Sequence, residues 1–246
     1  MFERNRRSPQ NDKKIVAKMR SFRPIEPPPS PISLVSYTSP SLPYPTTPIK
    51  AATPPAPAND NLIPVWSLTG DIVTAVCATA ALQIEDTPAV AFTFNLTPRS
   101  SDKALERPAR FLDHLKRHFD QELKRRLPGV SLPYWFAIDV THDGRRLHIH
   151  GVFAADAVWH PAVRETMKAA WGEWEGPGKH KQLLFKTPCD DGWATYSVRN
   201  QRKVAKIIGP RTFTISHALR RDAEWAYTEI RRIMREDESK FFWATM

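Results

Sequence analysis

The chain has 246 residues, enough for one domain of ordinary size and a terminal extension, and its formal net charge is +10. A basic balance suits a polyanionic partner such as a nucleic acid, because lysine and arginine neutralise phosphates. The two cysteines, Cys77 and Cys189, match no zinc spacing and argue against a disulfide framework or a thiol enzyme.

Residues 1–60 are expected to form a disordered, proline-rich and basic tail. More than half of the 23 prolines fall there, and proline with serine at this density leaves too little apolar surface to offset chain entropy. We expect the tail to be solvated, with non-specific gripping of DNA as the alternative.

Residues 61–88 form an N-terminal extension whose structure the pattern leaves open. Its alanine-rich run, Val73 to Leu82, fits either a helix or a strand. The longest apolar stretch of the chain, Ile72 to Ile84, is too short to cross a bilayer, and no signal-peptide core precedes it. We therefore expect a cytoplasmic protein without a membrane partner.

The main domain is expected over residues 89–236. It opens with an alternating strand, Ala89–Leu96, and continues with a helix, Pro108–Leu127. His114 and His118 lie four residues apart on this helix, as a zinc pair would. No helical His-Glu-x-x-His pattern surrounds them, so we expect solvated histidines.

A hairpin follows this helix. Its strands are expected over Tyr134–Thr141 and from Leu147 to Gly151, joined by the turn pair Asp143-Gly144. Asp-Gly between alternating segments is the strongest short-range hairpin signal, and a two-residue loop fixes the register of the strands.

In that register Asp139 lies opposite His148, and Ala137 opposite His150. Because strand side chains alternate between faces, both histidines and the aspartate share one face, and apolar residues occupy the other. Two imidazoles and a carboxylate predict a metal site that suits Mn²⁺ or Mg²⁺. A solvated strand face is the alternative.

The remaining elements complete an α+β pattern. They are a helix over Pro161–Trp174, a strand over Gln182–Lys186, a helix over Asp191–Ile207, a strand over Thr212–Ile215, a helix from Ser216 to about Arg235, and a C-terminal tail over residues 237–246. From residue 89 the order is βαββαβ, then a helix. This order predicts a ferredoxin-like, split βαβ antiparallel sheet with helices on one face and an open face for single-stranded nucleic acid.

The helix over residues 191–207 carries a second group of functional candidates. Tyr196, Arg199, Asn200 and Lys203 follow helical spacing and share one face. A phenol beside cations suits attack on a phosphate, because the cations stabilise charge on the nucleophile and the phosphoryl oxygens. An aromatic that only packs on a basic helix is the alternative.

In this order the residues resemble the HUH endonucleases, the single-strand nickases of rolling-circle replication. That family has a hydrophobic strand motif, then His-hydrophobic-His, then a helix with Tyr-x-x-Lys. The matching segments here are Ala91 to Thr97, His148-Ile149-His150 and Tyr196 to Arg199. The resemblance covers roughly residues 88 to 236. Arg199 stands where the family has lysine, and Lys203 one turn later is a second candidate for that role.

The resemblance implies a nick at a replication origin through a 5′-phosphotyrosine on Tyr196, starting rolling-circle replication of a plasmid or phage. Many replication initiators of this family carry an acidic metal ligand shortly before the histidine pair, where Asp139 lies. Thr93, Asn95 and Asn200 are expected either to contact DNA or to support the site. The chain has no P-loop segment, so a host helicase and polymerase are expected partners alongside single-stranded DNA.

Two other functions fit the same pattern. A single-tyrosine HUH transposase shares the order of motifs and would act on hairpin DNA. A non-catalytic nucleic-acid-binding protein with the same fold would keep the sheet, but it would not need the two histidines, the aspartate and the tyrosine together.

Overall fold

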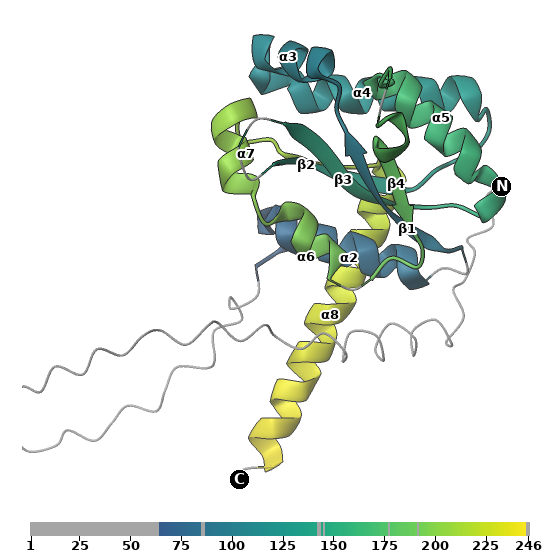
Figure 1. Cartoon of the computed structure of the whole chain (residues 1–246). Helices are drawn as coiled ribbons and strands as arrows, with labels where there is room; N and C mark the ends of the chain where they lie inside the picture. Colours follow the sequence, from purple (N-terminus) through teal and green to yellow (C-terminus); the bar gives the residue numbers. More distant parts are fainter. Residues whose placement is uncertain are drawn as a thin grey trace, which may run out of the picture.

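The computed structural model describes residues 64–244, apart from residues 85–86, 142–143, 145, 177 and 191. The basic tail expected over residues 1–60 and Asp143 of the expected turn lie outside the described residues. The ribbon in Figure 1 shows a sheet between two layers of helices.

The sheet is antiparallel and has five strands in the order β4-β1-β3-β2-β5. They are β1 (Ala89–Asn95), β2 (Tyr134–Val140), β3 (Leu147–Ala154), β4 (Leu183–Lys186) and β5 (Phe213–Ile215). All five were expected from the sequence, and the α+β class is confirmed. Because β1 and β2 each run antiparallel to β3, they are parallel to one another and need a crossover between them.

One face of the sheet packs against α4 (Phe111–Arg126) and α5 (His160–Trp171) (Figure 1). The indole of Trp171 lies at the centre of this core. Its ring centroid is 5.2 Å from that of Phe94 and 4.9 Å from that of Phe119, and its Nε1 donates a hydrogen bond to the carbonyl of Leu115. Aromatic packing therefore ties both helices to the strands.

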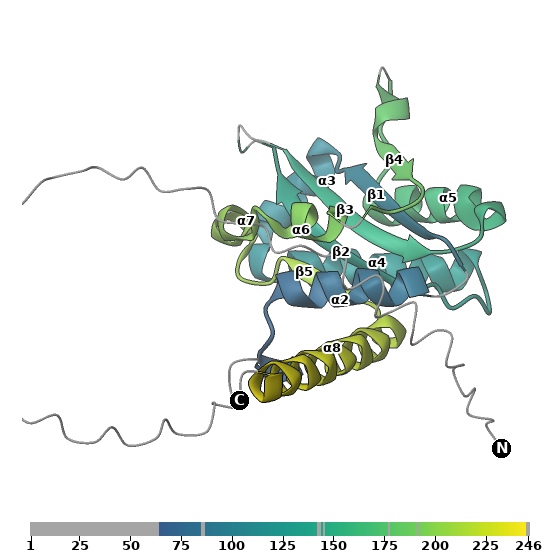
Figure 2. The same ribbon diagram turned by 90° about the horizontal axis from the view of Figure 1, so that it is seen from below.

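The other face is covered in part by α2 (Asp71–Ile84), α6 (Trp193–Val198) and α8 (His217–Ala244), as Figure 2 shows from below. The alanine-rich run is thus helical, and its small residues let α2 lie against α8 and the sheet. The expectation of helices on one face only is wrong, because the N-terminal extension and the last helix build a second layer.

The longest helix, α8, continues to Ala244, beyond the end near residue 235 that the sequence indicated. Residues 237–244 of the expected C-terminal tail are therefore helical. Within the described part of the chain, no helix combines the length and the apolar character that a membrane span requires, α8 included.

The remaining elements are short: η1 (Trp66–Leu68), α3 (Pro98–Glu106), η2 (Pro108–Arg110), η3 (Ala157–Trp159), η4 (Lys179–Lys181) and α7 (Gln201–Ile208). The sequence did not indicate α3, although Thr97 caps it by accepting a hydrogen bond from the Ser100 amide. The single helix expected over Asp191–Ile207 is wrong, because α6 and α7 are separate.

We predict that Gly151→Ala destabilises the fold by about 1–3 kcal/mol, as overpacking typically does. A Cβ at this position would meet the Trp135 carbonyl oxygen and lie 2.5 Å from the Phe92 ring. Urea unfolding measures the effect. Gly192→Ala is the matched control, because its Cβ would meet only Asp190, at 3.7 Å. Equal stability of the two variants would show that the sheet relaxes around the extra methyl group.

Candidate metal centre

The hairpin of β2 and β3 has the register expected from the sequence. Asp139 pairs with His148, and Ala137 pairs with His150. The alternating residues Leu147 and Ile149 are buried in the core on the far side. The two histidines therefore project from the opposite face of the hairpin. The small side chain of Ala137 leaves room beside His150.

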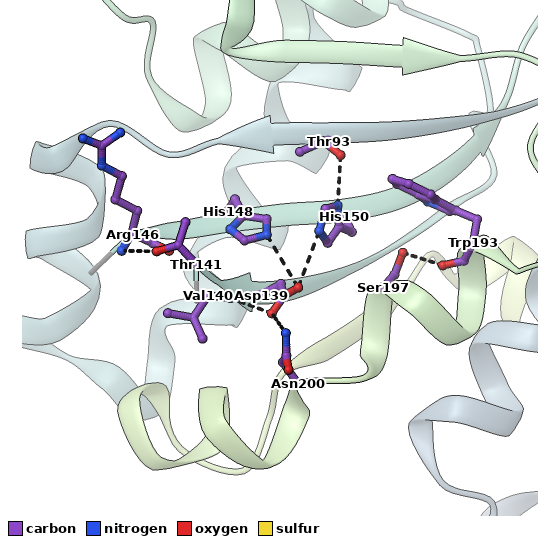
Figure 3. Close-up of polar contacts among 10 residues, drawn as sticks. All are labelled: Thr93, Asp139, Val140, Thr141, Arg146, His148, His150, Trp193, Ser197 and Asn200. Atoms are coloured by element: carbon purple, nitrogen blue, oxygen red, sulfur yellow. Dashed lines mark hydrogen bonds and ion pairs between the residues drawn. The ribbon is translucent and has the colours of Figure 1, made fainter. Parts of the chain in front are cut away.

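The three polar side chains converge on one point (Figure 3). The Nε2 atoms of His148 and His150 each lie 3.6 Å from the same oxygen of Asp139, Oδ2. One ligand atom from each residue lies within 4.8 Å of the others. A separation of 3.6 Å is longer than a normal hydrogen bond, so the three atoms face a common space without closing it.

The environment of Asp139 keeps its carboxyl group ionised. The side chain is only 2% exposed, and this burial alone would raise its pKa. The facing imidazoles, the amide of Val140 and the amide of Asn200 outweigh burial and hold the pKa of Asp139 well below its usual range. The hydrogen bonds from Val140 and Asn200 both reach Oδ1, at 2.7 Å and 3.0 Å, which leaves Oδ2 facing the histidines.

The surroundings of His150 favour the neutral form of its imidazole. Burial lowers the pKa of its imidazole, although the nearby Asp139 carboxylate acts in the opposite direction. Its Nδ1 lies 3.0 Å from the hydroxyl oxygen of Thr93. A hydrogen bond at Nδ1 orients the ring and directs Nε2 toward Oδ2 of Asp139, as outer contacts commonly do for histidines that bind metals.

Two ring nitrogens of the site are buried and have no hydrogen-bond partner among the described residues: Nε2 of His150 and Nδ1 of His148. An unsatisfied buried polar atom costs about 1–3 kcal/mol. A cation bound at Nε2 of His150 would remove that cost there. The donor set of two imidazoles and one carboxylate can therefore hold a divalent transition-metal ion.

Tyr196 lies beside this cluster. This residue is 40% exposed, and its ring centroid is 5.3 Å from that of His150. Trp193 stacks on one side at 5.5 Å, and the guanidinium carbon of Arg199 lies 3.9 Å from the ring centroid. A phenol open to solvent is thus held next to a candidate metal ligand with a cation against its ring.

Trp193 was not singled out from the sequence. Its Nε1 donates to the carbonyl of Gly151 at 3.0 Å, which ties α6 to β3 directly after His150. The spacing of Trp193, Tyr196 and Arg199 at three-residue intervals was the available signal, because such residues are neighbours on a helix.

The break between α6 and α7 separates the residues expected on one helical face, and that expectation is wrong. Tyr196 belongs to α6, and Lys203 belongs to α7. Asn200 lies at the break and donates to Asp139. Arg199 therefore accompanies the tyrosine, whereas Lys203 is exposed on the next helix.

The other candidates from the sequence divide between the site and its surroundings. Thr93 supports His150, and Asn95 pairs with His148 across the strands while its amide donates to the carbonyl of Lys181. His114 lies on α4, outside the cluster.

Comparisons with protein-family models, with curated proteins and with solved structures gave no match. The functional argument therefore depends on the chemistry of the site.

We predict that the full chain binds Mn²⁺ and that His150→Ala weakens this affinity by more than about a hundredfold. Loss of a residue that only supports a ligand costs up to about a hundredfold, and His150 itself supplies an unpaired buried nitrogen to the cluster. Isothermal titration calorimetry measures the Mn²⁺ affinity. His114→Ala removes an imidazole outside the cluster and should bind as the wild type does. Equal affinities in all three proteins would contradict the assignment.

We predict a smaller effect for Asn200→Ala, a loss of roughly tenfold in Mn²⁺ affinity, as for other outer-shell contacts. The substitution removes the hydrogen bond that orients the Asp139 carboxylate. Asn95→Ala is the matched control, because its amide donates to the Lys181 carbonyl and to no atom of the cluster among the described residues. If both variants titrate alike, Asn200 does not position the ligand.

Proposed function

We propose that this chain is a metal-dependent single-strand DNA nicking and joining endonuclease of the HUH type, with Tyr196 as the nucleophile. One observation carries the proposal: an exposed tyrosine ring packs directly against a buried imidazole of the Asp139, His148 and His150 cluster. A nucleophile and a metal ligand on adjacent elements are what phosphodiester transfer requires.

The topology supports the same proposal. The first four strands have the order β4-β1-β3-β2, with helical connections from β1 to β2 and from β3 to β4. This arrangement fits a ferredoxin-like, split βαβ core, which is also the core of the HUH family. In this proposal β5, α2 and α8 are additions that extend the sheet and cover part of its second face.

The chemistry proceeds at one phosphodiester bond. The Tyr196 oxygen attacks phosphorus and forms a phosphotyrosine bond, and the bond from phosphorus to the 3′-oxygen breaks. The tyrosine proton is released, and the leaving oxygen takes one up as a 3′-hydroxyl. Because the phosphotyrosine bond replaces the broken phosphate ester bond, rejoining needs no ATP. A later 3′-hydroxyl reverses the transfer and joins the strand.

The residues of the chain have distinct tasks in this scheme. Asp139, His148 and His150 hold Mn²⁺ or Mg²⁺, which when bound would polarise the scissile phosphate and stabilise the charge that develops on it. Arg199 supplies a positive charge next to Tyr196, in the place of the usual lysine. Lys203 is the second candidate for that task.

We further propose that this reaction opens a replication origin and starts rolling-circle replication of a plasmid or phage. The partner is then single-stranded DNA at the origin, and Thr93, Asn95 and Asn200 border the strand that reaches the metal centre. A host helicase and polymerase would extend the 3′-hydroxyl.

We predict that wild-type protein, Mn²⁺ and single-stranded circular DNA of mixed sequence yield a covalent protein–DNA adduct on a denaturing gel. Tyr196→Phe should abolish the adduct, because it keeps the ring and its packing but removes the attacking oxygen. Metal binding should remain, since the cluster is untouched.

Tyr227→Phe is the matched control, because that hydroxyl donates to the Pro64 carbonyl, a contact outside the metal centre. It should form the adduct as the wild type does. An adduct that survives Tyr196→Phe and maps to another peptide would overturn the assignment of the nucleophile. The absence of any adduct or nick from the metal-loaded wild type would overturn the proposed function.

A further inference from the structure

A large open cleft lies at the end of the sheet where β1 finishes and β3 begins. It encloses about 1060 Å³. Its lining includes Leu96, Phe111 and Trp171, which belong to the α4 and α5 core. The cleft is therefore on the face of the sheet opposite the metal centre, and none of the residues assigned to the nicking reaction lines it.

The cleft nevertheless begins close to the metal centre. Arg146 lines it and precedes His148 by two residues, a rise of roughly 7 Å along a strand. Leu96 also lines it, just beyond the end of β1, and directly follows Asn95, the pairing partner of His148. A DNA strand bound at the metal centre can therefore reach the cleft by passing around this end of the sheet.

Exposed cations gather at this end of the sheet. They are Arg99 and Lys103 on α3, Arg107 before η2 and Arg110 at its end, Arg146 before β3, and Arg202, Lys203 and Lys206 on α7. Helix α3 contacts α7, so the two groups adjoin. Of the carboxylates that line the cleft, Glu173 is already paired with Lys168 and Lys179, whereas Asp102 and Glu175 are exposed.

The wall of the cleft also offers flat rings. His114 and His118 lie with their ring centroids 4.2 Å apart. Burial, together with the neighbouring His118, Arg117 and Lys103, lowers the pKa of His114. The Nε1 atom of Trp174 is buried and has no hydrogen-bond partner among the described residues.

We propose that this cleft binds the stretch of single-stranded DNA next to the cleaved phosphate. The inference rests on the proposed function and extends it to a second contact region. Phosphates lie against Arg99, Lys103 and Arg146, and an unstacked base lies against the rings of His114, His118 and Trp174. Cations that track a backbone beside rings that stack bases are the features that sequence-tolerant binding of single strands requires.

The test measures binding without catalysis. Full-length protein is titrated against a fluorescent single-stranded oligonucleotide of mixed sequence in EDTA, and anisotropy is recorded at several salt concentrations. The double variant Lys103→Glu with Arg146→Glu should bind at least tenfold more weakly, and the slope of log affinity on log salt should fall by about 1.4. Trp174→Leu should weaken binding roughly fivefold through lost stacking.

The matched control carries the same change of charge elsewhere. Lys124→Glu with Arg220→Glu alters α4 and α8 near the start of β2, away from the cleft. It should leave affinity and salt slope near the wild-type values. If the control loses as much as the cleft variant, the contribution is only that of net charge and the proposal is overturned. A wild type that prefers RNA or binds no single strand would overturn it as well.

The two proposals fail separately. If the wild type nicks DNA but the cleft variants bind like the control, the cleft inference is wrong and the nickase stands. If the wild type binds single-stranded DNA through the cleft but forms no adduct with Mn²⁺, the nickase is wrong and the cleft stands as a single-strand binding site without the cleavage step.

Discussion

A carboxylate buried at 2% exposure between two imidazoles is the constraint on which the rest of the structure depends. A buried charge is tolerated only if hydrogen bonds or an ion compensate it. The chain provides the amide of Val140 from the same strand and the amide of Asn200 from a distant helical break. Both act on one oxygen of Asp139, so the other faces the histidines.

The second helical layer covers only part of its sheet face. Small residues of α2, among them Ala75, Ala78 and Ala81, pack with α8 near the sheet end where β1 starts. These contacts bury this part of the sheet face. The other half carries the polar cluster, with Thr93 and Asn95 only partly buried beside it. This face of the sheet is therefore part of the core at one end and a candidate reaction surface at the other.

The sequence predicted the hairpin because its information is local. Alternation and the Asp143-Gly144 pair determine which side chains share a face, and the observed pairing of Asp139 with His148 confirms that register. The alanine-rich run was ambiguous because periodicity cannot separate a short buried helix from a buried strand. Its helical form is decided by packing on α8, a partner far along the chain.

The break after α6 and the place of Trp193 were not predictable for a related reason. Asn200 leaves the helix to reach a carboxylate 61 residues earlier, and Trp193 reaches a carbonyl 42 residues earlier. Local spacing indicates only that Trp193 and Tyr196 are neighbours on a helix, and it does not indicate either distant partner. A prediction from helical periodicity continues the helix past such a break. For this reason it places Lys203 on the same face as Tyr196, although the two residues belong to different helices.

The most direct measurement of the central claim is anomalous diffraction from crystals grown with Mn²⁺. The account predicts the strongest anomalous peak between Nε2 of His148, Nε2 of His150 and Oδ2 of Asp139, about 2 Å from each nitrogen. A strongest peak elsewhere, for example at the His114 and His118 pair, with no density at the cluster, would contradict it.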